Sequence, residues 1–111
     1  MFIKVAFVDD NMVNRNTFVQ KVQNFDDLEV AFVAPTGEAC LEKLKELSPE
    51  KLPRILFVDL EMPNMSGIQL IQLVKVLYPS IHLIVLTVFD DDDRIFEAIK
   101  AGANGYLLKD D

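Results

Sequence analysis

Five short runs of apolar residues are distributed along the chain, and longer mixed segments separate them. The runs span residues 2–8, 29–34, 54–58, 81–86 and 105–108. They are rich in Val, Ile, Leu and Phe, and they show little alternation of polar and apolar positions. This pattern is typical of strands that are covered on both faces, as in a parallel sheet.

The segments between the runs carry apolar residues at helical spacing. The residues expected to face the core are Phe18, Val22 and Phe25, then Cys40, Leu44 and Leu47, then Leu70, Leu73, Val74 and Leu77, and finally Ile95, Ala98 and Ile99. Thr36, Ser66 and one member of the acidic run 90–93 are predicted N-caps, and Gly102 is a predicted C-cap. Strands and helices thus alternate as βαβαβαβαβ, which favours an α/β fold with a doubly wound parallel sheet.

Composition limits the class of protein. The length of 111 residues allows one domain with one core. A net charge of −7 argues against direct binding of nucleic acid phosphates or of an anionic membrane surface. The single cysteine, Cys40, excludes an internal disulfide and fits a reducing compartment. Because no apolar stretch approaches the roughly 20 residues of a membrane helix and the apolar start is too short for a signal peptide, we expect a cytoplasmic protein.

Polar residues follow four of the apolar runs at the points where the strands should end. Asp9 and Asp10 follow the first run, Asp59 the third, Thr87 the fourth and Lys109 the fifth. In an open parallel α/β sheet, ligands bind outside the carboxyl ends of the strands. We therefore expect these carboxylates, the hydroxyl and the ammonium to share one crevice.

Such a group of side chains suits a divalent cation and a phosphoryl group. A carboxylate can attack phosphorus to form an acyl phosphate, and Asp59 is the candidate because its strand should be central. Crowded carboxylates repel one another unless a cation neutralises them, and Mg²⁺ suits one or two carboxylates, waters and a substrate phosphate. Lys109 would pair with one phosphoryl oxygen, and the Thr87 hydroxyl would donate to another.

Four motifs occur in order along the chain. They are VDD with Asp9 and Asp10, VDLEMPNMSG with Asp59, Pro63 and Gly67, VLT with Thr87, and GYLLK with Lys109. Together they make the chain resemble, over essentially its whole length, the receiver domain of two-component response regulators. The ending GYLLKDD is similar to the subgroup whose regulators carry a C-terminal helix-turn-helix DNA-binding domain. The resemblance implies five parallel strands in the flavodoxin-like order 2-1-3-4-5.

The resemblance also implies roles for the acidic residues. Asp59 would accept a phosphoryl group from the phosphohistidine of a sensor histidine kinase. Asp10, Asp59 and the backbone carbonyl of Glu61 would bind Mg²⁺ directly, and Asp9 would act through bound water. Separately from the resemblance, the Glu61 carboxylate, two residues after Asp59, could orient a metal-bound water or repel an incoming hydroxide, and we hypothesise that it modulates the lifetime of the phosphorylated state.

The remaining site residues would connect phosphorylation to an output. Thr87 and Lys109 would hold the phosphoryl oxygens. Thr87 would also move toward the phosphate while Tyr106 turns inward, so that the surface of the fourth helix and fifth strand changes. The chain would therefore be a signalling phosphoacceptor and not an enzyme, and it would control transcription only through a DNA-binding domain that these 111 residues do not contain.

Two features depart from the usual pattern. Asp110 follows Lys109 where many receivers have a cis proline, so we expect a trans bond, or a cis bond held by strong surrounding structure. No helix follows the fifth run, so residues 1–111 are interpreted as a receiver domain that is truncated at its C-terminus and lacks its fifth helix. One face of the sheet would then be partly bare, which favours association, for instance as a homodimer.

Two other functions remain open on the sequence alone. A pseudo-receiver would keep the fold and bind partners without being phosphorylated, but the intact set of Asp59, Thr87 and Lys109 argues against it. A phosphatase with an aspartate nucleophile usually carries a second acid two residues later, where this chain has Glu61. A chain of 111 residues leaves no room for the cap domain that such a phosphatase uses.

Overall fold

The five apolar runs form five parallel strands in the computed structural model, which describes residues 2–88 and 92–109. The elements are β1 (Ile3–Val8), α1 (Met12–Val22), β2 (Leu28–Ala34), α2 (Gly37–Glu46), the 3₁₀ helix η1 (Pro49–Lys51), β3 (Ile55–Val58), α3 (Gly67–Leu77), β4 (His82–Thr87), α4 (Asp92–Ala101) and β5 (Gly105–Leu108). Each predicted strand agrees with the observed one to within one residue at either end. None of the described helices is both long enough and apolar enough to cross a membrane.

The strands are hydrogen bonded in the order β2-β1-β3-β4-β5. The predicted flavodoxin-like, doubly wound α/β fold is therefore confirmed. From β1 the chain passes first to β2 on one side and later to β3 on the other, so the order reverses between β1 and β3. Ligands of such sheets bind at this reversal, outside the carboxyl ends of the strands.

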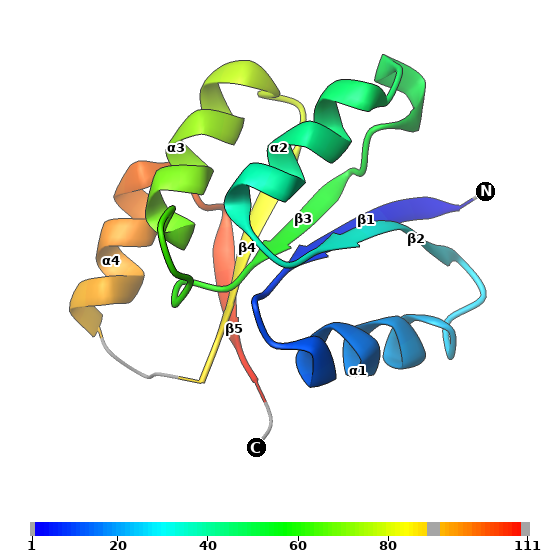
Figure 1. Cartoon of the computed structure of the whole chain (residues 1–111), viewed down its shortest axis with the longest axis horizontal. Coiled ribbons are helices and arrows are strands. Elements are labelled where there is room, and N and C mark those ends of the chain that lie inside the picture. The colour runs from blue at the N-terminus through cyan, green and yellow to red at the C-terminus, as the bar shows by residue number, and fades with distance from the viewer. Residues whose placement is uncertain (1, 89–91, 110–111) are drawn as a thin grey trace.

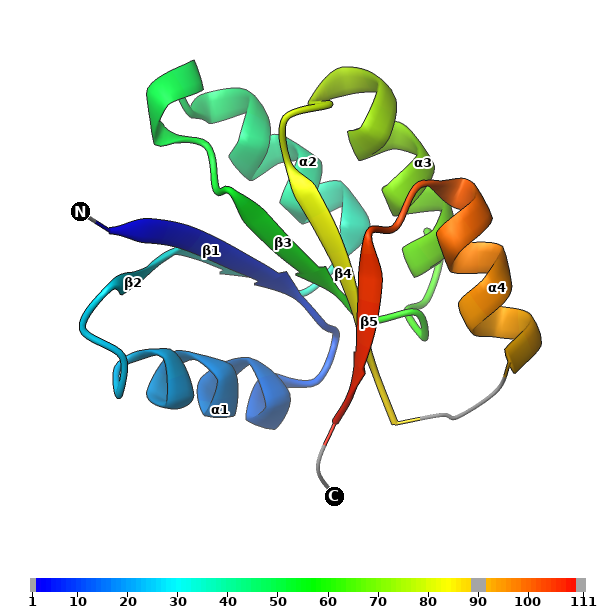
Figure 2. The ribbon, with the colours of Figure 1, turned by 180° about the vertical axis from the view of Figure 1, so that it is seen from behind.

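The helices cover the two faces of the sheet unequally (Figures 1 and 2). α2, α3 and α4 lie on one face, and α1 alone lies on the other. The main buried cluster lies between the sheet and the three helices, and it includes alternate strand residues such as Ala6 and Leu56. On the other face α1 is anchored by Phe18, whose ring centroid lies 4.8 Å from that of Phe7 and 5.4 Å from that of Phe57.

The predicted helix caps are largely confirmed. Thr36 and Ser66 each accept a hydrogen bond from a backbone N–H in the first turn of the following helix, α2 and α3 respectively. Gly102 follows α4 with φ = 127°, a conformation that L side chains rarely adopt. In the acidic run 90–93, the first two residues lie outside the described part of the chain. The last two lie in the first turn of α4, where their charge complements the helix dipole.

Four residues predicted to face the core are exposed instead. They are Phe25, Leu73, Leu77 and Ile99. Phe25 lies beyond the end of α1, Leu73 and Leu77 lie on α3, and Ile99 lies on α4. Periodicity gives the direction of an apolar helix face but not the width of its contact with the sheet. The prediction is wrong at these positions because the contact is narrower than the apolar stripe.

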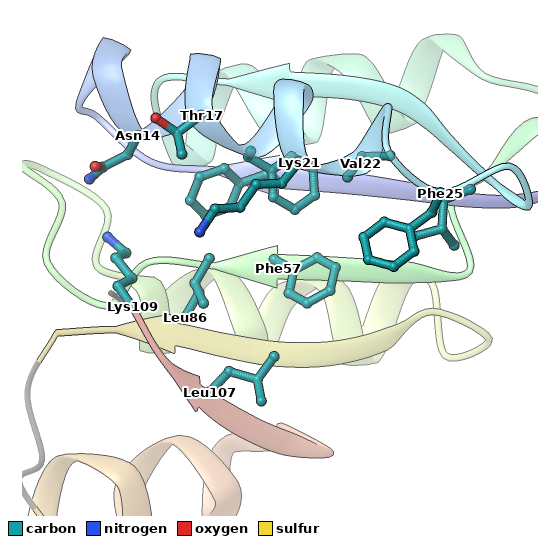
Figure 3. Close-up of a pocket in the computed structure, with 12 residues that line it drawn as sticks. Asn14, Thr17, Lys21, Val22, Phe25, Phe57, Leu86, Leu107 and Lys109 are labelled. Carbon is teal, nitrogen blue, oxygen red and sulfur yellow. The ribbon is translucent and has the colours of Figure 1, made fainter. Parts of the chain in front are cut away.

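The face covered by α1 also carries a groove between that helix and the strands on the β5 side (Figure 3). Its volume is about 340 Å³, and its lining includes Phe18, Phe25, Phe57, Leu86 and Leu107. The residues that the structure describes contain no α-helix after β5. The groove is therefore consistent with the expectation that one face of the sheet, the face that carries α1, is partly bare.

We predict that this groove binds apolar molecules and promotes association. Leu107→Gln should lower the fluorescence of a dye that binds exposed apolar surface, such as anilinonaphthalene sulfonate, and lower the apparent mass at high protein concentration, because it removes exposed apolar surface from the groove. Leu77→Gln is the matched control. Leu77 is 58% exposed and Leu107 is 54% exposed, but Leu77 lies on α3, over the opposite face. Wild-type protein that binds no dye and stays monomeric in light scattering would contradict the prediction.

Candidate functional site

The strand register brings two buried aspartates together. Val8 of β1 pairs with Val58 of β3. The residues that follow them, Asp9 and Asp59, therefore lie side by side at the carboxyl edge of the sheet. The backbone continues the ladder, since Asp59 N donates to Val8 O at 3.0 Å and Asp9 N donates to Ala34 O at 3.1 Å. Both aspartates are buried, so the two apolar strands fix a pair of like charges at the reversal of the strand order.

The last two strands add the hydroxyl and the ammonium. Thr87 of β4 pairs with Leu108 of β5, so Lys109 is the first residue beyond the paired strands. Lys109 N donates to Thr87 O at 2.7 Å, which fixes the lysine backbone. Thr87 is buried, in agreement with its predicted place at the end of a covered strand.

The Lys109 ammonium connects the two aspartates. Nζ donates to Asp9 Oδ2 at 2.7 Å and lies 3.5 Å from Asp59 Oδ1. The lysine side chain is only 13% exposed, so these ion pairs are screened less by water and salt than pairs at the surface. One cation thus stabilises two carboxylates that would otherwise repel each other.

Three carboxylates form a group that fits a hard divalent cation. Asp9, Asp10 and Asp59 each offer an oxygen, and these oxygens lie within 4.8 Å of one another. Donors of the protein already bind both oxygens of Asp9, whereas Asp10 is exposed to water. Mg²⁺ commonly keeps several waters and uses one or two carboxylates. This donor set therefore fits Mg²⁺.

Burial changes the acidity of the central carboxylate. It raises the pKa of Asp59 from its ordinary 3.8 to about 6, because the ionised form loses water. The positive charge of Lys109 opposes this rise in pKa, and the negative charges of Asp9 and Asp10 add to it. The buried Asp59 carboxylate therefore holds its negative charge less easily than an exposed aspartate does.

The loop after β3 packs closely around Asp59. An ideal Cβ on Gly67 would lie 2.4 Å from the Asp59 carbonyl oxygen and 2.7 Å from Leu60 Cα, so any side chain there would displace this backbone. Asn64 has φ = 67°, a left-handed conformation that asparagine tolerates well. Glu61 N donates to Asp59 Oδ1 at 3.3 Å. The close approach of this backbone thus explains why the last position of the VDLEMPNMSG motif is a glycine.

The start of helix α1 supplies contacts to the site that the sequence pattern does not predict. Asn11 caps the helix, and its N–H donates to Asp9 Oδ1 at 2.9 Å. Asn14 Nδ2 donates to Asp9 Oδ2 at 3.0 Å, and Arg15 Nη1 donates to the Asp9 carbonyl oxygen at 2.8 Å. An asparagine before a helix is an N-cap signal that could have revealed Asn11. The spacing of Asn14 and Arg15 resembles that of any polar helix residue and gave no signal.

A second contact missed from the sequence joins α4 to the loop after β3. The Arg94 guanidinium forms a hydrogen-bonded ion pair with the Glu61 carboxylate. Because both side chains are more than a third exposed, the pair adds little to stability. The ion pair with Arg94 holds the Glu61 side chain toward α4.

The two residues assigned to the conformational switch lie on neighbouring strands. Thr87 ends β4, and Tyr106 of β5 pairs with Val85 of β4. Tyr106 is 43% exposed, whereas Thr87 is buried. Their coupled movement stays a prediction. The bond between Lys109 and Asp110 lies outside the described residues.

The acidic group, the strand-end lysine and the strand order together define a class of protein. A sequence profile of the response regulator receiver domain matches residues 5–111. The chain therefore belongs to the response regulator receiver domain family, whose members are signalling domains.

Individual relatives agree with this assignment. The chain is 36% identical over 108 residues to the transcriptional regulatory protein LnrK of Bacillus subtilis, covering 97% of this chain and 47% of the relative. It is 32% identical over 108 residues to the oxygen regulatory protein NreC of Staphylococcus epidermidis, covering 96% and 48% respectively. The signal receiver domain of the putative response regulator NarL from Mycobacterium tuberculosis has a TM-score of 0.87 at 27% identity, covering 99% of this chain and 86% of that one. The chain thus spans about half the length of these curated relatives, one of which is named as a transcriptional regulatory protein, and the predicted resemblance to response regulators is confirmed.

We predict that Asp59→Asn raises the free energy of unfolding of the metal-free protein above pH 6. The pKa of Asp59 is raised from 3.8 to about 6, so the folded state holds this proton more tightly than the unfolded state does. Stability from this group is therefore present at low pH and is lost as the pH rises from 3.8 through 6. The stability gap between Asp59→Asn and wild type should be largest above pH 6 and should shrink as the pH falls.

Urea unfolding with a chelator present, at pH values on both sides of 6, measures this gap. Asp26→Asn is the control, because Asp26 is exposed in the loop between α1 and β2. The gap for this control should not follow the same pH dependence. An advantage of Asp59→Asn that grows as the pH falls would contradict the prediction.

Proposed function

We propose that this chain is a phosphorylation-controlled switch in which Asp59 accepts a phosphoryl group from the phosphohistidine of a sensor histidine kinase. The observation that carries the proposal is the position of Lys109 Nζ, 2.7 Å from Asp9 and 3.5 Å from Asp59. A pseudo-receiver would not need a buried ammonium beside an ionisable carboxylate. A phosphatase would need a cap over its substrate, and the described elements form only a single sheet with its helices.

The proposed reaction is an in-line displacement at phosphorus. An oxygen of ionised Asp59 forms a bond to phosphorus while the bond from phosphorus to the imidazole nitrogen of the donor breaks. The imidazole nitrogen keeps the electron pair of that bond. Lys109 would move from Asp9 toward a phosphoryl oxygen, and the Thr87 hydroxyl would donate to another.

The metal would be held by residues at the same edge of the sheet. Asp10, Asp59 and the backbone carbonyl of Glu61 would be direct ligands, and Asp9 would act through bound water. When bound, Mg²⁺ would supply positive charge that offsets the repulsion between the carboxylates and the phosphoryl group. The oxygens of Asp9, Asp10 and Asp59 within 4.8 Å of one another support this assignment.

The proposed output is a change of surface followed by control of transcription. Movement of Thr87 and Tyr106 would alter the surface of α4 and β5. Residues 1–111 would be the truncated receiver domain of a longer cytoplasmic regulator, and contact with DNA would belong to a domain beyond this chain. The chain supports this view because it carries a net charge of −7 and spans about half of relatives named as regulators. A second copy, bound at the groove, would form a homodimer.

The test is phosphorylation by a small donor. Incubation with Mg²⁺ and acetyl phosphate should add the mass of one phosphoryl group to the intact protein, and Asp59→Asn should abolish the gain. Asp26→Asn, which changes an exposed carboxylate, should retain the gain. Wild type without any gain would favour a pseudo-receiver, whereas steady phosphate release from varied substrates would favour a phosphatase.

Glu61 is proposed to set the lifetime of the phosphorylated state. Its N–H donates to Asp59 Oδ1, so the Glu61 backbone lies beside the acceptor, and its carboxylate is paired with Arg94. We propose that the carboxylate comes close enough to add negative charge near a phosphoryl group on Asp59. This charge should repel incoming hydroxide, so Glu61→Gln and Glu61→Ala should speed dephosphorylation a few-fold. Arg94→Ala should slow it, because the same charge is then left unpaired.

Loss of phosphate from the purified, phosphorylated protein measures these rates. If Glu61 instead orients the attacking water, Glu61→Ala would slow dephosphorylation. Rates that are indistinguishable from wild type in every variant would remove Glu61 from the mechanism.

A further inference from the structure

Three donors of the protein bind the Asp9 carboxylate. Its Oδ1 accepts from Asn11 N at 2.9 Å, and its Oδ2 accepts both from Lys109 Nζ at 2.7 Å and from Asn14 Nδ2 at 3.0 Å. Asp9 is fully buried. Water therefore cannot easily replace a donor that is lost.

Asn14 and Lys109 meet at one end of the groove between α1 and β5 (Figure 3). Both residues line this groove, and their polar ends lie close to each other there. They share a single acceptor, Asp9 Oδ2. The strength of the lysine contact with Asp9 therefore depends on whether the amide is present.

The backbone of Asn14 is fixed independently of its side chain. Its N–H donates to the side chain of the N-cap residue Asn11 at 3.1 Å, and Arg15 holds the Asp9 carbonyl at 2.8 Å. The start of α1 is thus tied to the end of β1 on both sides of the amide. A substitution at Asn14 should change the contact with Asp9 Oδ2 without moving the helix.

We propose that Asn14 is a positioning residue that holds Asp9 Oδ2 and so keeps the Lys109 ammonium shared between Asp9 and the phosphoryl acceptor Asp59. This inference rests on the proposed function and deepens it. A neutral amide satisfies part of the acceptor capacity of Asp9 without adding charge. Lys109 Nζ is then free to lie 3.5 Å from Asp59, where it can reach an incoming phosphoryl oxygen.

The chemistry of the amide explains the choice of residue. An apolar side chain would leave Oδ2 to Lys109 alone and draw the ammonium toward Asp9. An aspartate of the same size would put a third carboxylate beside Asp9 and compete for the same lysine. A longer amide on glutamine would keep the donor and reach the same oxygen after a change of rotamer.

The test compares Asn14→Leu, Asn14→Asp and Asn14→Gln with the control Thr17→Val. Thr17 lies one turn further along α1 and lines the same groove. Phosphorylation by acetyl phosphate in Mg²⁺ should fall roughly tenfold in Asn14→Leu, the size expected from loss of a hydrogen bond to a charged group. It should fall in Asn14→Asp as well, recover at least in part in Asn14→Gln, and stay unchanged in Thr17→Val.

A second measurement separates positioning from folding and from the proposed function. The ¹⁵N resonance of the Lys109 ammonium, recorded in metal-free protein, should shift in Asn14→Leu and Asn14→Asp but not in Thr17→Val. Unchanged phosphorylation and an unchanged resonance in Asn14→Leu would overturn the inference. Wild type that cannot be phosphorylated would refute the proposed function, while the lysine resonance would still test the role of Asn14.

Discussion

The site depends on one electrostatic constraint, which is that the sheet buries two carboxylates side by side and supplies one ammonium to hold them. Asp9 and Asp59 are placed by the register of β1 and β3, and Lys109 reaches both from the far end of the chain. The ion pair between Asp9 and Lys109 joins residues separated by 100 positions in sequence. Asn11 and Asn14 at the start of α1 also bind the Asp9 carboxylate, but the shared ammonium is in place only when β5 has paired with β4. The full set of site residues therefore comes together only when the first and the last strand of the chain are both part of the sheet.

Much of the fold could be predicted because its signals are local. Buried parallel strands produce continuous apolar runs, and their carboxyl ends meet at one edge, so Asp9, Asp59 and Lys109 could be placed together from sequence alone. The contacts of Asn14 with Asp9 and of Arg94 with Glu61 could not be predicted in this way. They depend on the angle at which a helix packs and on the reach of a side chain, and neither quantity leaves a pattern in the sequence. For the same reason, the sequence pattern predicts a wider contact between helix and sheet than the structure has, as the exposed Leu73, Leu77 and Ile99 show.

The site also shows how function opposes stability. An ionised carboxylate at the position of Asp59 is poorly hydrated, and its neighbours Asp9 and Asp10 repel it. A protein selected for stability alone would not keep this arrangement. The loop around Asp59 adds a steric demand, since Gly67 has no room for a side chain against the acceptor backbone. Any cation or partner that neutralises the site in the folded state will stabilise the domain by mass action.

The place of Lys109 in both the acceptor site and the groove has a thermodynamic consequence. Its ammonium contacts Asp9, while the same side chain lines the apolar groove beneath α1. A molecule or segment that fills the groove and favours one position of this lysine would change the equilibrium of the proposed phosphorylation. The proposed phosphorylation would then change the affinity of the groove by the same factor, because coupling free energies are reciprocal. Through the single side chain of Lys109, binding in the groove and the proposed phosphorylation of Asp59 would be thermodynamically coupled.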